Sequence, residues 1–356
     1  MKDQHDAQKG GASDATVREM RELLADCFAR RPFLYWLDLG SSTAIAYPAT
    51  LYFLLAPGFG PLHVLAYLVG GFALFRIGSF IHEIQHMRRD EMKAFKVVWN
   101  IVCGVPLLMT SNTYDNHADH HSARSYGTER DGEYVTLGAG PPSRILLYYL
   151  QVPLLPLLAL VRFGVLGPLS LLHPGLRRWV LEHASSYGIN TRYALSPARQ
   201  SSQSLYALRD LACGAYVIAL VVAVATGLLP LYFVGRLYLF VVFTIGLNWT
   251  RNLAAHRYHD HGGPVGMVEQ LEDTVTITGG LTTELLFPLG LRYHSLHHVL
   301  ATIPYHELGR AHRRLLERLG PDAPYRRTLY PSLWSVLRNL VVDARSGAGV
   351  ARARLA

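Results

Sequence analysis

Histidines are the residues best placed to do chemistry in this chain. Seventeen of its 356 residues are histidine, and eight of them fall into three short clusters. On a helix, positions i, i+3 and i+4 share one face, so each cluster is predicted to aim its imidazoles in a common direction. The clusters are His82 and His86, then His117, His120 and His121, then His294, His297 and His298.

The first cluster spells His-Glu-x-x-His, a motif in which two histidines hold zinc and the glutamate, here Glu83, acts as general base of a peptidase. Eight imidazoles are too many for one tetrahedral zinc with an open position. Neighbouring histidines such as His120 and His121 diverge by about 100° on a helix, which favours two metal ions over one. A membrane zinc peptidase remains an alternative, which would need only His82, His86 and one acidic ligand.

A fourth element adds a ninth histidine. Asn252 and His256 are four residues apart, directly after an apolar run, and are predicted to share one helical face. Nine imidazoles divided between two metals give four or five each. That ligand number leaves room for water or dioxygen at redox-active iron.

These motifs resemble the membrane fatty acid desaturase family from about residue 33 to about residue 318. The family carries three histidine boxes, H-x(3-4)-H, H-x(2-3)-HH and H/Q-x(2-3)-HH, interleaved with two transmembrane hairpins. Its acyl-CoA desaturases add N-x-A-A-H, which the stretch from Asn252 to His256 matches at each position. The first box differs from theirs because three residues, not four, separate its histidines, as in bacterial acyl-lipid desaturases and carotenoid or sterol oxidases.

The resemblance implies a di-iron site with dioxygen as co-substrate. It implies that Glu83 accepts a hydrogen bond from a ligand's second ring nitrogen rather than activating water, and Asp115, Asp119 and Asp273 are candidates for the same supporting role. The implied iron ligands are His82, His86, His117, His120, His121, His256, His294, His297 and His298, with Asn252 acting through a water molecule. His259 and His261, in "HDHGG", are interpreted as a loop and not as a further box.

Four apolar runs must position these clusters. Each approaches the roughly 20 residues that a membrane-spanning helix needs. They pair into two hairpins, and the charged residues that interrupt them are expected near span ends, where long side chains reach the interface. A fifth region, 144–172, is broken by prolines and glycines and is predicted to re-enter or lie flat, since the clusters must share one membrane face. The four runs are about 33–57, 61–81, 205–228 and 230–249.

Composition supports a membrane protein. Half of the residues are hydrophobic and only 17% are charged, which is too apolar a balance for a typical soluble enzyme. The net charge of +8 comes from arginines that flank apolar segments, so it favours the positive-inside bias of membrane proteins over nucleic-acid binding. The three cysteines form no C-x-x-C pair and suggest neither a disulfide framework nor a thiolate metal site.

The expected fold class is an all-α integral membrane protein. It has two transmembrane helical hairpins, hence four spans, plus interfacial or re-entrant helices and a cytoplasmic histidine-rich cap. Residues 1–32 are expected to form a polar N-terminal tail, 33–318 the desaturase-like domain and 319–356 a basic C-terminal tail, with both termini cytoplasmic.

The function that the resemblance implies is O2-dependent desaturation of a lipid acyl chain at the cytoplasmic membrane face. Hydroxylation of a fatty acid, carotenoid or related lipid on the same scaffold is the alternative. A non-enzymatic receptor that keeps the fold without metal would have lost histidine boxes, and all are intact. The chain shows no segment that would bind flavin or haem, so an external electron-transfer protein of ferredoxin, rubredoxin or cytochrome b5 type is expected, and no nucleic-acid partner.

Overall fold

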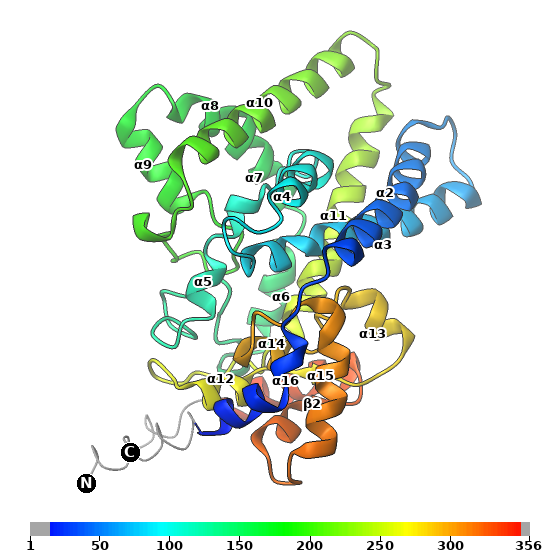
Figure 1. Cartoon of the computed structure of the whole chain (residues 1–356). Coiled ribbons are helices and arrows are strands. Elements are labelled where there is room, and N and C mark those ends of the chain that lie inside the picture. Colours follow the sequence, from blue (N-terminus) through cyan, green and yellow to red (C-terminus); the bar gives the residue numbers. More distant parts are fainter. Residues whose placement is uncertain (1–14, 350–356) are drawn as a thin grey trace. The chain divides into compact units, whose positions relative to one another are not determined.

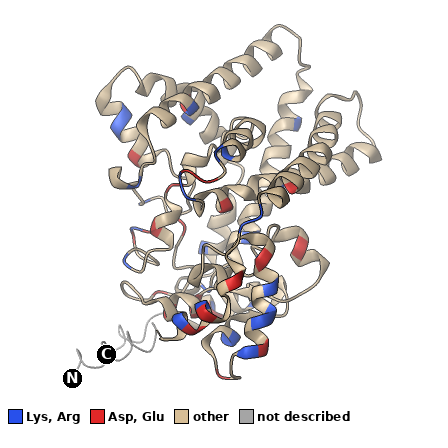
Figure 2. Cartoon of the chain, viewed as in Figure 1, with Lys and Arg blue, Asp and Glu red and all other residues tan. Residues whose placement is uncertain are grey.

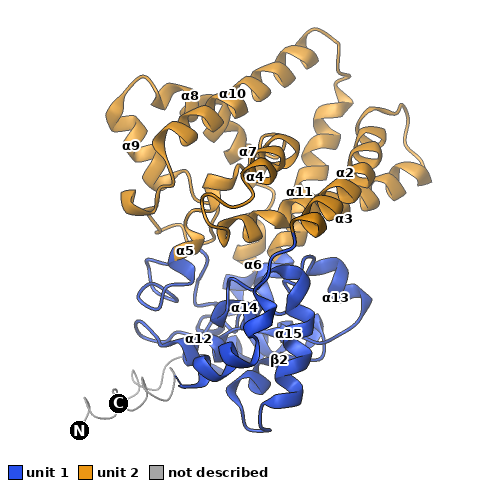
Figure 3. Cartoon of the chain, viewed as in Figure 1, with its two compact units in different colours: residues 1–31, 119–145, 250–356 blue, residues 32–118, 146–249 orange. Residues whose placement is uncertain are grey.

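The computed structural model describes residues 15–349, which are predominantly helical (Figure 1). Within them the only strands are β1 (Thr276–Ile277) and β2 (Leu329–Tyr330), which pair in parallel. The all-α class predicted from the sequence is therefore confirmed. The chain divides into two compact units (Figure 3): unit 1 is 1–31, 119–145 and 250–356, and unit 2 is 32–118 and 146–249.

Unit 2 contains most of the long apolar helices. Helices α5, α6 and α11 contribute residues to both units. The elements are α2 (Pro32–Leu55), α3 (Pro61–Gln85), α4 (Lys93–Trp99), η2 (Asn100–Gly104), η3 (Ser111–Tyr114), α5 (His117–His120), α6 (Ser143–Leu150), α7 (Leu155–Val161), η5 (Arg162–Leu166), α8 (Gly167–Ser170), α9 (Pro174–His183), η6 (Pro197–Arg199), α10 (Gln203–Ala225) and α11 (Tyr232–Leu253).

Three helices, α3, α10 and α11, are long and apolar enough to cross a membrane. Helix α6 and the helical stretch Leu155–Ser170 are together also long and apolar enough to cross a membrane. They bend by 45° at the break between them, as a broken span or a re-entrant loop does. The described residues thus hold the three to four apolar helices of a multi-pass integral membrane protein. Helix α2 covers the first expected span but is not among them, since Asp38 and the polar run 41–43 lower its hydropathy.

Helices α2 and α3 pack closely along each other within unit 2 (Figure 1). Gly70 of α3 permits this approach, because a Cβ atom there would lie 2.9 Å from Thr50 Oγ1 of α2. Asp38 of α2 and Arg76 of α3 neutralise each other, with Arg76 Nε 2.8 Å from Asp38 Oδ1. Asp38 and Arg76 are thus paired across the two helices, which removes much of the cost of placing charge in an apolar unit.

Charges elsewhere in unit 2 are also paired. Asp210 on α10 is fully buried within the protein and contacts Arg162 Nη2 at 3.0 Å and Arg177 Nη1 at 2.5 Å. Arg236 on α11 donates to the backbone carbonyls of Phe53, in the last turn of α2, and of Ala56, just beyond that helix. Figure 2 shows how sparse charged residues are along α10 and α11.

Unit 1 is built from shorter helices around two hydrophobic cores. Residues 15–23 are also helical. The remaining elements are η1 (Ala25–Cys27), η4 (Leu137–Ala139), α12 (Met267–Asp273), β1, α13 (Leu281–Leu286), α14 (His294–Val299), α15 (Tyr305–Arg318), η7 (Pro324–Thr328), β2 and α16 (Leu333–Ser346).

The segments expected as terminal tails contribute to these cores. Met20, Leu24 and Cys27 are fully buried in one core with residues of α14 and α15. Their spacing of four and then three residues places them on one face of a helix, a pattern that a search for long apolar runs does not detect. At the other end, α16 buries Leu333 and Val336 in the second core. The expected polar and basic tails are therefore folded over much of the described length.

This packing predicts that Leu24→Ala destabilises unit 1. Removing a fully buried leucine side chain costs about 2–5 kcal/mol, because the cavity it leaves closes only in part. The measurement is the thermal unfolding midpoint of the detergent-purified protein. Exposed Glu22 is the matched control, since Glu22→Ala changes the same segment and should shift stability by less than about 0.5 kcal/mol. Equal midpoints for the two variants would contradict the packing.

Candidate metal centre

The predicted histidine clusters lie at the ends of helices or on very short ones. His82 occupies the last turn of α3 and His86 caps that helix. His117 and His120 begin and end α5, and His121 follows it. His294, His297 and His298 all lie on α14, which begins at His294. Short helices leave the backbone free to turn after each box, so the imidazoles of one box need not all point the same way.

Four histidines of unit 1 gather into one buried group, His120, His256, His294 and His298, with one nitrogen of each within 4.8 Å of the others. His256 Nε2 lies 3.2 Å from His120 Nε2 and 3.0 Å from His294 Nε2. Nitrogens of different rings thus converge on one point. Imidazole donors in this number suit iron, zinc or copper.

Hydrogen bonds to the outer nitrogens orient two of these rings. His120 Nδ1 lies 2.9 Å from Asp131 Oδ2, and Asp131 is fully buried. His256 Nδ1 lies 2.9 Å from the hydroxyl of Tyr126, which donates to Asp273 Oδ2 at 2.6 Å. Because a neutral imidazole carries its proton on one nitrogen, a bond that keeps the proton on Nδ1 leaves Nε2 to face the group as a lone-pair donor.

Electrostatics keep most of the group neutral. Burial, with neighbouring histidines, lowers the pKa of His256, His294 and His298 well below the ordinary value. Burial is the largest influence on the pKa of His120 and acts to lower it, but the charge and hydrogen bond of Asp131 and the charge of Glu133 together outweigh burial, so the net shift is upward. Neither ring nitrogen of buried His298 has a hydrogen-bond partner among the described residues. A neutral imidazole buried in this way fits a metal ligand, since coordination would satisfy the ring.

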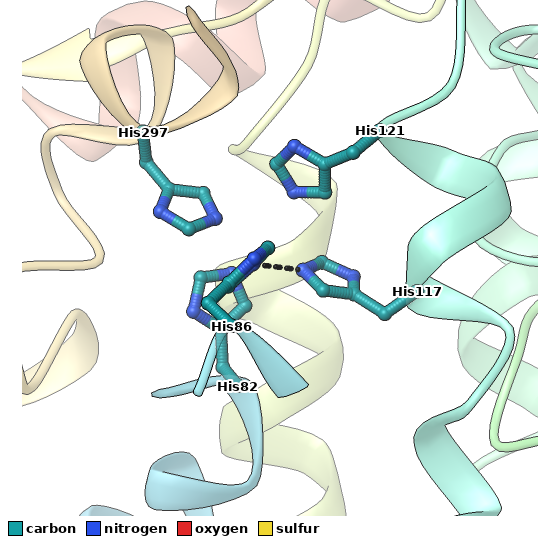
Figure 4. Close-up of side chains that lie close together, drawn as sticks. All are labelled: His82, His86, His117, His121 and His297. Atoms are coloured by element: carbon teal, nitrogen blue, oxygen red, sulfur yellow. Dashed lines mark hydrogen bonds between the residues drawn. The ribbon is translucent and has the colours of Figure 1, made fainter. Parts of the chain in front are cut away.

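Three histidines of unit 2 form a second convergent set (Figure 4). His86 Nε2 lies 3.0 Å from His117 Nε2, and the rings of His82 and His117 are 4.7 Å apart between centroids. Tyr114 stacks on the His117 ring at 4.6 Å with an interplanar angle of 15° and so fixes its plane. The first box and the first histidine of the second box therefore present their nitrogens together within this unit.

Glu83, the glutamate of the His-Glu-x-x-His motif, accepts a hydrogen bond from the hydroxyl of Tyr35 on α2. Both side chains are buried, with Glu83 4% and Tyr35 0% exposed. A peptidase base must reach a metal-bound water. Here the carboxylate contacts a buried phenol, an arrangement that supports a structural role for Glu83 and weighs against the zinc peptidase.

Sequence neighbours within a box separate as predicted. His121 and His297 belong to unit 1 but not to its four-histidine group, and their rings lie 4.8 Å apart, nearly perpendicular (Figure 4). Their neighbours His120 and His298 are both in that group. The divergence expected between adjacent helical positions thus divides each HH pair.

The prediction that Asn252 and His256 share one helical face is wrong. Helix α11 ends at Leu253, and two tight turns follow before His256 pairs in antiparallel fashion with Thr274. The backbone N–H of Arg257 donates to the carbonyl of Asp273 at 2.7 Å, so this pairing brings Asp273 beside His256. Asn252 is half-buried, and its carbonyl accepts the hydroxyl of Tyr258.

The carboxylates expected to support the ligands have different surroundings. Asp273 reaches His256 through Tyr126, and Asp115 accepts hydrogen bonds from Ser201 N–H and the Tyr206 hydroxyl. Asp119 is half-exposed, and its role in supporting a ligand stays a prediction. Sequence reasoning missed Asp131, whose only signal is the Asp-Gly turn of "RDGEY", and it missed Tyr126 and Tyr35, which carry no motif.

His259 and His261 lie beside Asp273, outside both histidine sets. His261 Nε2 is 3.5 Å and His259 Nδ1 is 3.7 Å from Asp273 Oδ1. Burial alone would raise the pKa of Asp273, but its contact with His261 and the charges of the neighbouring histidines outweigh burial and hold the pKa below its usual range. Asp273 therefore stays ionised beside the four-histidine group.

Comparisons with known proteins found a family match and a relative that aligns over nearly the whole chain. Residues 58–329 match the family described as fatty acid desaturase. Over 349 residues the chain is 34% identical to a protein of Caulobacter vibrioides (strain NA1000 / CB15N) described as ceramide hydroxylase, and the match covers 96% of this chain and 97% of that protein. No solved structure matches the chain significantly.

The His120–Asp131 contact predicts that Asp131→Asn weakens metal retention about 10–100-fold, because the ring loses the charge that orients it. The measurement is metal per chain after equilibration with graded chelator. The paired variant is Asp119→Asn, one residue from the same histidine, which should retain metal as the wild type does. If Asp119→Asn lost more metal than Asp131→Asn, the residue that supports His120 would be Asp119, as the sequence predicted.

Proposed function

We propose that this chain, which belongs to the fatty acid desaturase family, is a membrane di-iron oxidase that hydroxylates an unactivated carbon of a ceramide-like lipid. The observation that carries the proposal is the buried four-histidine group of unit 1, whose nitrogens converge while Asp131 and Tyr126 hold the outer nitrogens of two rings. An oxidoreductase acting on lipid in a membrane is what the family implies.

The proposed ligands divide into two sets. One iron takes His120, His256, His294 and His298. The second takes the remaining five histidines, and Asn252 acts through a water molecule. The five, as predicted from the sequence motifs, are His82, His86, His117, His121 and His297. Bound iron would supply the redox chemistry by which dioxygen oxidises an unactivated C–H bond.

The chain's own residues would do the rest. The imidazoles whose pKa values are lowered offer lone pairs without having to lose a proton. Buried Asp131 and Tyr126 orient the rings of His120 and His256. The apolar helices α3, α10 and α11 would hold the hydrocarbon substrate in a water-poor region, where a reactive carbon is kept in one position. Glu83 and Tyr35 would fix the end of α3 that carries His82 and His86.

We favour hydroxylation over desaturation because the Caulobacter vibrioides protein, which matches nearly the whole chain, is described as a ceramide hydroxylase. Ceramide is therefore the first substrate to test. Desaturation of an acyl chain is the second candidate, favoured by the description of the family and by the N-x-A-A-H stretch ending at His256. The two outcomes share the first removal of hydrogen and differ in whether oxygen is then transferred or a second hydrogen is lost.

The proposed topology is two hairpins, with the histidine clusters and both termini on the cytoplasmic face. Helix α2 would supply the fourth span, through its pairing with α3 and the neutralised Asp38–Arg76 pair. Electrons would come from an external carrier of ferredoxin, rubredoxin or cytochrome b5 type. The arginines that flank the apolar segments would suit an acidic protein of that kind.

The first test compares iron content and lipid products of wild type and His297→Ala in an expressing host. The expected result is about two irons per wild-type chain, since imidazole sites of this kind suit iron, and loss of the lipid product in the variant. The matched control is His183→Ala, which changes an exposed histidine that stacks on Trp179 and belongs to neither histidine set, and it should keep product and iron. One zinc per chain, retained in His297→Ala, would overturn the di-iron assignment in favour of a peptidase.

The second test identifies the product by mass spectrometry of lipids from cells supplied with ceramide. We expect ceramide with one added oxygen atom, formed only when dioxygen and an electron donor are present. Ceramide or another acyl lipid lacking two hydrogens would identify a desaturase. Unchanged ceramide with an oxidised fatty acid or carotenoid would exclude the ceramide substrate while keeping the oxidase.

A further inference from the structure

Tyr126 lies between a carboxylate and a histidine of the four-histidine group. Its side chain is fully buried, its hydroxyl is 2.9 Å from His256 Nδ1, and the same hydroxyl donates to Asp273 Oδ2 at 2.6 Å. Asp273 Oδ2 itself is 4.0 Å from His256 Nδ1, which is too far for a hydrogen bond. The carboxylate therefore acts on His256 by way of Tyr126.

The hydroxyl of Tyr126 has a single proton, and the position of this proton sets the direction of the hydrogen bonds that link Asp273, Tyr126 and His256. Since Tyr126 donates to Asp273, it has only lone pairs to offer His256, so the bond between them requires the proton to be on His256 Nδ1. That tautomer leaves His256 Nε2 as a lone pair facing the rings of His120 and His294. His120 reaches the same state by a different route, with Asp131 in direct contact with its Nδ1.

We propose that Tyr126 is a positioning residue that fixes the tautomer and ring orientation of His256 for metal binding. This inference rests on the proposed metal centre and adds a residue that belongs to none of the histidine boxes. A shared tyrosine hydroxyl does for His256 what a direct carboxylate does for His120, and it does so over a distance that Asp273 cannot bridge alone.

The surroundings of Tyr126 hold it in this position. Its ring packs on those of His120 at 5.5 Å, His298 at 5.5 Å and Tyr134 at 5.1 Å between centroids. The other oxygen of the carboxylate, Asp273 Oδ1, accepts the backbone N–H of His259 at 3.3 Å and contacts His261. Because these contacts hold both the ring of Tyr126 and the carboxylate of Asp273, the Tyr126 hydroxyl has little freedom to turn away from His256.

Tyr134 provides a matched control. Its hydroxyl donates to the same oxygen, Asp273 Oδ2, at 2.7 Å, and it is also buried. Its hydroxyl is 2.9 Å from the carbonyl of His259, however, and not from a nitrogen of His256. Tyr134→Phe thus removes an equivalent hydrogen bond from Asp273 and keeps the link to His256, whereas Tyr126→Phe removes both.

The experiment titrates ferrous iron into anaerobic, chelator-stripped wild type, Tyr126→Phe and Tyr134→Phe in detergent and records Mössbauer spectra of the loaded proteins. We expect Tyr126→Phe to bind one of two irons about 10–100-fold more weakly and to change the spectrum of that iron, as loss of a residue that supports a metal ligand does. Tyr134→Phe should keep the affinity and spectrum of the wild type. Thermal midpoints should fall in both variants, because each loses the hydrogen bond to Asp273 and a second contact of the same hydroxyl.

The outcomes separate this inference from the function on which it rests. Wild type that binds fewer than two irons would overturn the proposed metal centre itself. Wild type that binds two irons, with equal affinities and spectra in both variants, would overturn the role of Tyr126 alone. If Tyr126→Phe does not fold, Asp273→Asn is the second variant. It removes the charge and keeps the tyrosine, and it should weaken the same iron.

Discussion

Burying imidazoles is the constraint on which the rest of this structure depends. Seven of the nine clustered histidines are buried, and each ring brings one nitrogen that donates and one that accepts. A buried polar group without a partner costs about 1–3 kcal/mol, so the fold must supply partners for the outer nitrogens and a common target for the inner ones. Asp131 and the Tyr126–Asp273 pair meet the first demand in unit 1, while the convergence of the Nε2 atoms of His120, His256 and His294 is the arrangement that a metal ion would complete.

Unit 2 resolves a similar conflict for formal charges. An apolar unit tolerates ionised side chains only when they are paired or bonded to backbone carbonyls. Asp38 meets Arg76, Asp210 meets two arginines, and Arg236 satisfies carbonyls at the end of α2. The Arg236 contacts join α11 to α2, which are far apart in the sequence, whereas the Asp38–Arg76 pair joins the consecutive helices α2 and α3. The charges that interrupt the apolar runs thus also hold helices together.

The sequence predicted well what depends on local periodicity and motif spacing. Apolar length predicted the spans that became α3, α10 and α11, and His120 and His121 separate as expected for adjacent helical positions, although His121 lies just after the end of α5. It failed where a short turn redirects the chain. After Leu253 the helix stops, and His256 enters a strand-like pairing with Thr274, so the face shared with Asn252 does not form. Partners distant in sequence were also missed, since nothing near His120 or Glu83 marks Asp131 or Tyr35.

The His-Glu-x-x-His stretch shows why a motif acquires its meaning from what surrounds it. In a peptidase the glutamate faces solvent across the metal and takes a proton from water. In this chain the same five positions end a helix whose glutamate is 4% exposed and bonded to Tyr35 of the neighbouring helix. The hydroxyl of Tyr35 makes Glu83 a fixed acceptor in the helix packing. The two histidines keep their capacity to bind metal, while the glutamate between them contributes to holding α2 against α3.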